Sequence, residues 1–245
     1  MAKLEAHNVT KKYKFTGNEC VALKDISIQI NDHDFISIVG KSGAGKSTLL
    51  YILSSIRKAD SGSVSMDQIN LTDLNDYKLS RLRGLKIGIV FQDSRLIDDL
   101  TIFDNIALPG YLYRKRKDVD KDATRLLNAF SMSDQKDKFP SELSAGQKQR
   151  IAFARALIND PDILFLDEPT GNLDVQTGKW IYKYLQALNE KGKTIVMVTH
   201  NIYAASISKK VWILSSGKIK SEISFENEPA TDSNDRMKRI YSAMY

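Results

Sequence analysis

An apolar run that passes directly into a glycine-containing loop is the feature that most restricts how this chain can fold. Phe35-Ile36-Ser37-Ile38-Val39 predicts a buried strand of a parallel sheet, and residues 48–53 predict a helix packed against that sheet. The connecting residues, Gly40-Lys41-Ser42-Gly43-Ala44-Gly45-Lys46-Ser47, match G-x-x-x-x-G-K-[ST] in the strand-to-helix context that this pattern requires. We therefore expect an α/β protein with a phosphate-binding loop at the end of this strand.

The chemistry of this loop follows from its residue types. Glycines let backbone N–H groups surround phosphate oxygens, and the start of the following helix adds a favourable dipole. Lys46 is predicted to contact the β- and γ-phosphates of a nucleoside triphosphate, and the Ser47 hydroxyl is predicted to bind Mg²⁺. The phosphate-binding residues predicted here are Gly40, Lys41, Ser42, Gly43, Ala44, Gly45, Lys46, Ser47 and Thr48.

Two further motifs lie later in the chain. The apolar run Ile163-Leu164-Phe165-Leu166 ends in two carboxylates, of which Asp167 is predicted to hold Mg²⁺ and Glu168 to act as general base on an attacking water. Leu143-Ser144-Ala145-Gly146-Gln147 opens a helix shortly before this run, and a glycine-containing helix start is a second anion site for the same nucleotide. Two such sites on one nucleotide imply that two copies of the chain share it.

The ordered set of motifs resembles the nucleotide-binding domain of ABC (ATP-binding cassette) proteins over about residues 4–222. The family's Leu-Ser-Gly-Gly-Gln signature is represented by residues 143–147. The resemblance implies a P-loop NTPase fold with a RecA-like parallel-sheet core, an N-terminal antiparallel β part and a helical subdomain inserted at about 93–160. The ABC ATPase domain is predicted to span 1–225, and an amphipathic pattern predicts a helix in the tail 226–245.

The resemblance also assigns roles to single residues. Gln92 stands in the Q-loop position, where it would bridge Mg²⁺ and the attacking water, and His200 is the switch histidine that contacts the γ-phosphate. Tyr13 would stack on adenine, and Asp174, in the D-loop Gly171-Asn172-Leu173-Asp174, would be a further nucleotide-binding residue. The implied cofactors are ATP and Mg²⁺. The implied catalytic residues are Glu168, His200 and Gln92, the Mg²⁺ ligands are Ser47, Gln92 and Asp167, and the signature residues facing a second copy's nucleotide are Ser144, Ala145, Gly146 and Gln147.

Each of these residues has an ordinary alternative when taken singly. An Asp-Glu pair at a strand end is often a turn, and Asp174 fits the N-cap of a helix. A lone histidine such as His200 is more often structural, and Tyr13 fits simple packing. The order of the motifs favours the functional interpretation. Ala145 departs from the family pattern, because a methyl group replaces the usual first glycine and restricts positive φ.

Residues 92–109 resemble one branch of the family, which comprises lipoprotein-release, macrolide-export and antimicrobial-peptide-resistance ATPases and the cell-division ATPase FtsE. In that branch the segment contacts the coupling helix of a membrane subunit. The resemblance therefore predicts a separate membrane permease with an external domain as partner, and export or extraction of peptides, lipoproteins or amphiphilic drugs. The alternative functions are an FtsE-like regulator of cell-wall remodelling and a soluble ABC ATPase of repair or translation. For the segment itself, the alternative is that residues 92–109 form a merely buried helix.

Composition agrees with a peripheral protein at the inner face of the cell membrane. No apolar stretch approaches the roughly 20 residues that span a bilayer, and the first residues lack a signal-peptide pattern. The single cysteine, Cys20, agrees with a reducing, cytoplasmic compartment. Net charge is +6, but the basic run Arg114-Lys115-Arg116-Lys117 lacks interleaved aromatic residues, so no nucleic-acid partner is expected. The expected partners are the permease and a second copy of the chain.

Overall fold

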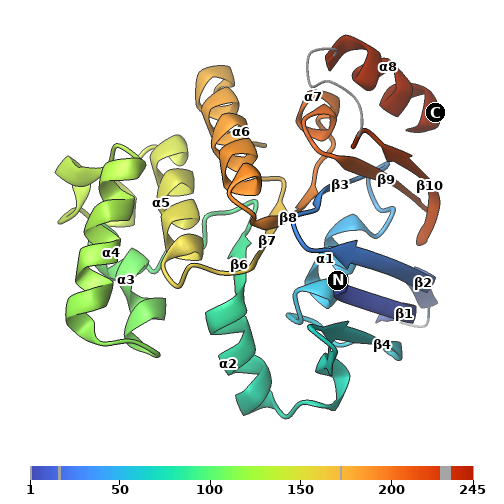
Figure 1. Cartoon of the computed structure of the whole chain (residues 1–245), viewed down its shortest axis with the longest axis horizontal. Coiled ribbons are helices and arrows are strands. Elements are labelled where there is room, and N and C mark those ends of the chain that lie inside the picture. Colours follow the sequence, from blue (N-terminus) through green and yellow to red (C-terminus); the bar gives the residue numbers. More distant parts are fainter. Residues whose placement is uncertain (1, 16–17, 172, 227–232, 245) are drawn as a thin grey trace. The chain divides into compact units, whose positions relative to one another are not determined.

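The computed structural model describes residues 2–15, 18–171, 173–226 and 233–244, and it divides into two compact units (Figure 1). Unit 1 consists of Met1–Leu79 and Tyr182–Tyr245, and unit 2 consists of Ser80–Ile181. Helices α2 (Asp76–Lys86) and α6 (Val175–Glu190) each have residues in both units. Among the described residues, no helix is both long and apolar enough to cross a membrane.

Unit 1 contains an antiparallel sheet in the order β2-β1-β4-β5. Its strands are β1 (Ala2–Phe15), β2 (Asn18–Asn31), β4 (Ser61–Met66) and β5 (Ile69–Asn70). A bulge at Asn8, which has a φ of 49°, shifts the register of β1. As a result, Ala6 and Val9 are both buried although they are three residues apart.

A mainly parallel sheet forms the centre of unit 1. Strand β3 (Phe35–Val39) pairs in parallel with both β8 (Thr194–Val198) and β9 (Lys210–Ser215), and β10 (Lys218–Ser224) pairs antiparallel with β9. Every residue of β3 and β8 is buried, which is why their sequences are continuous apolar runs rather than alternating ones.

Of the described helices, three lie wholly within unit 1, namely α1 (Lys46–Leu53), α7 (Ile202–Ser206) and α8 (Ser233–Met244). A short 3₁₀ turn, η1 (Leu71–Asp73), follows β5. Helix α8 contributes Ile240 to a buried cluster that also contains Val39 of β3 and Ala205 of α7. The C-terminal helix is therefore packed on the parallel sheet and its neighbouring helix.

Unit 2 combines a parallel strand pair with a group of helices. Strand β6 (Ile87–Val90) pairs with β7 (Ile163–Asp167). The helices are α3 (Ile102–Tyr111), α4 (Arg116–Ala129) and α5 (Ala145–Leu157), with 3₁₀ turns η2 (Ser133–Gln135) and η3 (Pro140–Glu142) between α4 and α5. Phe130 is fully buried, with its ring 6.4 Å from that of Phe153 and 5.4 Å from that of Trp180.

The predicted helical insertion at 93–160 contains α3, α4 and α5, whereas the compact unit around them also includes β6 and β7. Helix α4 is amphipathic, because its buried residues Val119, Ala123, Leu126 and Leu127 recur at helical spacing. The domain boundaries at 93, 160 and 225 stay predictions.

Candidate functional site

The loop between β3 and α1 makes close approaches that require glycine. A Cβ atom at Gly40 would lie 2.1 Å from the carbonyl oxygen of Leu214, and one at Gly45 would lie 2.3 Å from that of Ala22. Gly45 also has a φ of 102°, which disfavours other residues. At Gly43 a Cβ would meet nothing within 4 Å. The loop backbone is thus braced against β2 and β9 while open at Gly43, as phosphate binding requires.

Lys46 spans this loop. Its Nζ donates hydrogen bonds to the carbonyl oxygens of Gly40 (2.9 Å) and Lys41 (3.0 Å). The first turn of α1 contains no acidic residue, so its N-terminal dipole is not neutralised from within the turn. Ser47 and Thr48 lie in that turn and are half-buried. A cation and a helix start therefore converge on one open loop, a combination that suits a phosphate group.

Tyr13 is held by the segment that follows α1. The Arg57 guanidinium donates a hydrogen bond to the Tyr13 hydroxyl (2.7 Å), and its Cζ lies 5.5 Å from the centre of the Tyr13 ring. Asp60, on the same segment, accepts hydrogen bonds from the Lys11 ammonium (2.7 Å) and the Lys12 backbone N–H (2.6 Å). These two bonds hold the pKa of Asp60 below its usual value. The ring that we expect to stack on adenine is therefore held by the segment that follows the phosphate-loop helix.

His200 follows strand β8, at the same sheet edge as the phosphate loop. The backbone N–H of Thr199 donates to the carbonyl oxygen of Ile38 (3.2 Å), which continues the parallel pairing to the last residues before Gly40. His200 itself is exposed. The next residue, Asn201, is the N-cap of α7 and accepts a hydrogen bond from the backbone N–H of Ala204 (3.2 Å). The structure thus brings His200 and the phosphate loop to one edge of unit 1.

In unit 2 the predicted carboxylates lie at the end of β7. Asp167 is its last residue and is 4% exposed, and Glu168 has a φ of 46° in the turn that follows. Because Val90 of β6 pairs with Leu166, Gln92 and Glu168 each lie two residues beyond a paired position. A Cβ at Gly171 would lie 3.8 Å from Glu168 Cβ and 3.9 Å from Gln92 Nε2. Gln92 and Glu168 are therefore brought together, as the sequence predicts.

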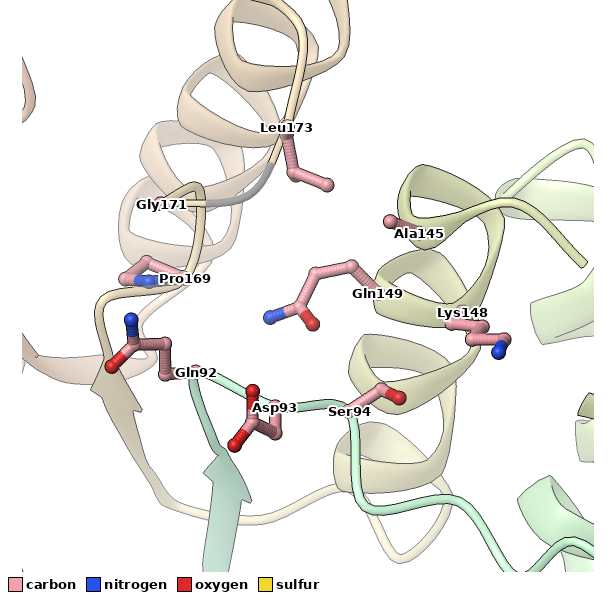
Figure 2. Close-up of a pocket in the computed structure, with 9 residues that line it drawn as sticks. All are labelled: Gln92, Asp93, Ser94, Ala145, Lys148, Gln149, Pro169, Gly171 and Leu173. Atoms are coloured by element: carbon pink, nitrogen blue, oxygen red, sulfur yellow. The ribbon is translucent and has the colours of Figure 1, made fainter.

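Gln92 and Gly171 border a pocket of about 180 Å³ (Figure 2). Figure 2 shows Gln92 beside Pro169 and Gly171 on one side and Ala145 at the start of α5 on the other. The side chain of Gln149 extends from α5 between them, and its Nε2 donates to the carbonyl oxygen of Phe91 (3.2 Å). The pocket therefore lies between the start of α5 and the segment that carries Gln92.

The signature residues form a reciprocal cap at the start of α5. The backbone N–H of Gln147 donates to Ser144 Oγ (3.3 Å), and the backbone N–H of Ser144 donates to Gln147 Oε1 (2.9 Å). Ala145 is the first residue of the helix, a position that takes a negative φ. The methyl group of Ala145 consequently imposes no backbone strain, and the Ser144 hydroxyl proton can still be donated to a phosphate oxygen.

Asp174 has the bonds of a helix N-cap. Its carboxylate accepts hydrogen bonds from the Thr177 hydroxyl (2.7 Å) and from the backbone N–H groups of Thr177 (2.9 Å) and Gln176 (3.0 Å). The Thr177 hydroxyl makes the largest contribution to lowering the pKa of Asp174. The ordinary interpretation of Asp174 therefore accounts for its contacts, and a role toward nucleotide stays a prediction. Asn172 of the D-loop lies outside the described residues.

Sequence reasoning missed two residues of α5 that hold the Gln92 segment. Besides Gln149, Arg155 donates from Nη1 to the carbonyl oxygen of Arg95 (2.6 Å) and from Nη2 to that of Ser94 (2.7 Å). Burial lowers the pKa of the Arg155 guanidinium. The available signal was the spacing of Gln149 and Phe153, which puts a glutamine on the apolar face of the predicted helix.

A second cleft in unit 2 is lined by residues on both sides of Gln92 along the chain. It has a volume of about 370 Å³ and is lined by β6, by the end of α5 and by Phe91, Arg95, Ile97 and Pro109. Ile97 is 44% exposed and Leu108 is 38% exposed, whereas Ile102, Ile106 and Ala107 of α3 are buried. The alternative of a buried helix thus describes half of the residues of α3, while Ile97 and Leu108 remain available to a partner.

A phosphate-binding loop between a parallel strand and a helix is the mark of P-loop nucleoside triphosphatases. The family model described as "ABC transporter" matches residues 23–171. The chain therefore belongs to the ABC transporter family, and it is an ATP-binding and ATP-hydrolysing subunit.

The relatives of the chain are ATP-binding proteins of this family. It is 42% identical over 228 residues to an uncharacterised ABC transporter ATP-binding protein, MJ0796 of Methanocaldococcus jannaschii, covering 91% of this chain and 96% of that protein. It is 41% identical over 225 residues to the bacitracin export ATP-binding protein BceA of Halalkalibacterium halodurans, covering 91% and 89%. The macrolide export ATP-binding/permease protein MacB of Neisseria meningitidis is 38% identical over 95% of this chain, which spans 36% of MacB.

Two solved structures of MJ0796 resemble the chain closely. A dimeric post-hydrolysis state bound to ADP and Pi has a TM-score of 0.86 and 39% identity, and covers 90% of this chain and 98% of its own. A dimeric structure described as a bacterial ABC transporter cassette has the same TM-score and coverage with 40% identity. The predicted family, its export-related branch, the α/β fold and the ATPase activity are confirmed. The roles of individual residues stay predictions.

Proposed function

We propose that the chain powers a separate membrane permease that exports or extracts peptides, lipoproteins or amphiphilic drugs, from the cytoplasmic face of the cell membrane. The observation that carries this proposal is the 41% identity to BceA over 89% of its length, because BceA is named as an export ATP-binding protein. The relation to MacB, named as a macrolide exporter, supports the same branch. A permease with an external domain is the partner that we expect.

We infer that unit 1 binds the nucleotide. The backbone from Gly40 to Gly45 would surround the phosphates, and Lys46 would exchange its bonds to loop carbonyls for bonds to the β- and γ-phosphates. Tyr13 would stack on adenine with Arg57 holding its hydroxyl. His200 would contact the γ-phosphate from the strand end beside the loop. These positions are supported by the bracing contacts of the loop and by the register of β3 with β8.

We propose that the chemistry of hydrolysis falls to unit 2. Asp167 presents an almost buried carboxylate at a strand end, and Gln92 presents an amide oxygen, so with the Ser47 hydroxyl the donor set is of the kind that Mg²⁺ takes. Bound Mg²⁺ would offset charge on the phosphate oxygens. Glu168 would accept the proton of the attacking water, and Gln92, adjacent to it, would orient that water.

Two copies would complete each site. Solved MJ0796 cassettes are dimeric. In this chain Ser144 and Gly146 open α5, whose first turn is free of acidic residues, so the signature can receive the γ-phosphate bound by a partner copy. ATP would hold the two copies together, and its hydrolysis would release them, which converts the reaction into movement of an attached permease.

The cleft beside the Gln92 segment is the surface that we assign to the permease. Its lining is mainly apolar, it includes exposed Ile97, and Phe91 links it to Gln92 along the chain. Arg155 fixes the carbonyls of Ser94 and Arg95 between Gln92 and Ile97. A permease helix seated in this cleft would therefore act on the same backbone segment that carries Gln92.

The proposal is tested by co-purification with a candidate permease, such as a membrane protein found to be encoded next to this chain. Ile97→Asp should reduce the amount of chain that co-purifies in detergent about tenfold, because a carboxylate buried at an apolar contact costs roughly 1.4 kcal/mol or more. Ile56→Asp is the matched control, since Ile56 is an exposed isoleucine of unit 1. Equal losses for both variants would remove the cleft as the docking site.

A cellular measurement separates export from regulation. Loss of the chain should raise sensitivity to peptide antibiotics or macrolides without a primary defect in division. If depletion instead disturbs division and leaves drug sensitivity unchanged, the FtsE-like regulator replaces export as the function.

A further inference from the structure

The C-terminal helix α8 contacts the helix that begins two residues after His200. In Figure 1, α8 lies beside α7, and both belong to unit 1. Helix α7 runs from Ile202 to Ser206 and is capped at its start by Asn201, the neighbour of His200. Arg236 of α8 donates from Nη1 to the carbonyl oxygen of Ser206 (3.2 Å), at the other end of α7. The two ends of α7 are thus fixed by Asn201 and by α8.

Arg236 is a buried cation, with 6% of its surface exposed. Its Nη2 donates to the carbonyl oxygen of Phe225 (3.3 Å), and its Cζ lies 4.7 Å from the centre of the Phe225 ring. A buried charge is stable where carbonyl groups satisfy it, and a cation at the last carbonyls of a helix is also favoured by the helix dipole. The Arg236 side chain therefore anchors α8 to the C-terminal end of α7.

Ile240 lies one turn further along the same face of α8 and is fully buried. Its cluster contains Val39, the residue before Gly40 of the phosphate loop, and Ala205 of α7. Helix α8 thus contacts both the strand that leads to the phosphate loop and the helix that follows His200. A five-residue helix is too short to be stable by itself, so the position of α7 depends on this packing.

We propose that α8 is a positioning element for His200, with Arg236 and Ile240 holding α7 against β3 so that the imidazole stays at the strand edge beside Gly40. The inference rests on the γ-phosphate contact proposed for His200. Arg236 does not touch nucleotide in this scheme, and it acts through α7 and Asn201. The alternative is that α8 merely covers apolar surface, which would affect stability but not the discrimination between nucleotides.

The discriminating measurement is the ratio of ATP affinity to ADP affinity, because a γ-phosphate contact strengthens binding of ATP alone. Arg236→Met should lower this ratio about fivefold and lower kcat by about tenfold, with a smaller effect on ADP binding. Arg236→Lys should recover part of both, because an ammonium can still donate to a carbonyl. Arg239→Met is the matched control, since Arg239 also lies over the Phe225 ring (4.9 Å) but is exposed and pairs with Asp235 of α8.

His200→Ala tests the γ-phosphate contact of His200 separately from the positioning by α8. It should lower the ATP-to-ADP ratio by itself, and adding Arg236→Met to it should cause little further loss, because the two residues act on one contact. An unchanged ratio in His200→Ala would contradict the role of His200. A lowered ratio in His200→Ala with an unchanged ratio in Arg236→Met would overturn the role of α8.

A variant at Ile240 covers the case in which Arg236→Met fails to fold. Ile240→Val removes one methylene from the same interface and should lower the ratio about twofold with the fold retained. Thermal unfolding of each variant identifies folded material. A folded Ile240→Val protein with the wild-type ratio would also overturn the inference.

Discussion

Arg57 and Tyr13 form a contact in which one residue sets the orientation of another. The hydrogen bond from Arg57 to the Tyr13 hydroxyl and the guanidinium over the ring restrict a side chain that we propose to stack on adenine. Arg57→Ala should weaken ATP binding about three- to fivefold, as expected for losing roughly 1 kcal/mol of preorganisation, with kcat at saturating ATP nearly unchanged. Fluorescence anisotropy with a labelled ATP gives the affinity.

The control for this prediction is Lys58→Ala, because Lys58 is the next residue and pairs with Asp76 (3.4 Å) rather than with Tyr13. Tyr13→Phe keeps the ring and removes the hydroxyl, so Arg57→Ala should have a smaller effect in that background. Full additivity of the two changes would show that Arg57 does not act through Tyr13.

Several site residues have a structural bond as well as a predicted function. Ser144 and Gln147 cap α5, and Asp174 caps α6. Local spacing predicts both roles, since a short polar side chain caps one N–H group at a helix start while the other N–H groups of the first turn can bind an anion. The Asp174 contacts are those of the ordinary alternative, which shows that a motif match does not by itself decide which duty a residue performs.

At the scale of elements, α5 supports the segment that carries Gln92. Arg155→Met removes two hydrogen bonds from a charged donor to the carbonyls of Ser94 and Arg95. We expect a loss of about 3 kcal/mol in the free energy of unfolding, because hydrogen bonds to charged groups contribute about 1.5–3 kcal/mol each and the carbonyls can regain water. The corresponding fall in Tm is roughly 6–12 °C, measured by differential scanning calorimetry.

Arg125→Met provides the comparison for Arg155→Met. Arg125 lies on α4 with 73% of its side chain exposed and forms an i,i+3 ion pair with Asp122, so its loss should change stability by less than about 1 kcal/mol. Faster amide hydrogen exchange in residues 93–97 is expected for the Arg155 variant and not for the Arg125 variant. Similar exchange in both would show that α5 does not hold this segment.

The sequence predicts those elements whose signal is continuous along the chain. The strands β3, β7 and β8 are apolar runs because both faces are covered, and the loop after β3 has a fixed spacing. Arg155 contacts Ser94, and Arg236 contacts Ser206, in each case through a backbone carbonyl of a residue far away in sequence. Every residue has a backbone carbonyl, so no sequence pattern indicates these contacts. Strand β4, Ser61–Met66, is rich in serine and glycine and lacks a clear pattern.

For the whole molecule, we propose that each ATP is bound by one copy and that a second copy completes its binding site. Two inactive variants test this claim when they are mixed before nucleotide is added. Glu168→Gln should bind ATP but lose hydrolysis by about a hundredfold or more, and Ser144→Asp should spoil the signature that serves the partner's ATP. If the sites are shared, a mixed dimer has one site with both defects and one with neither.

Mixing should therefore restore hydrolysis that neither variant shows alone. With random pairing about half of the dimers are mixed and each has one intact site of two, so the expected rate is about a quarter of the wild-type rate. In a control mixture, Glu190→Gln replaces Glu168→Gln, because Glu190 is an exposed residue at the end of α6. This mixture should be active, since its Glu190→Gln homodimers have two intact sites and each mixed dimer has one. Sites built within single copies would leave the mixture of Glu168→Gln and Ser144→Asp as inactive as its components.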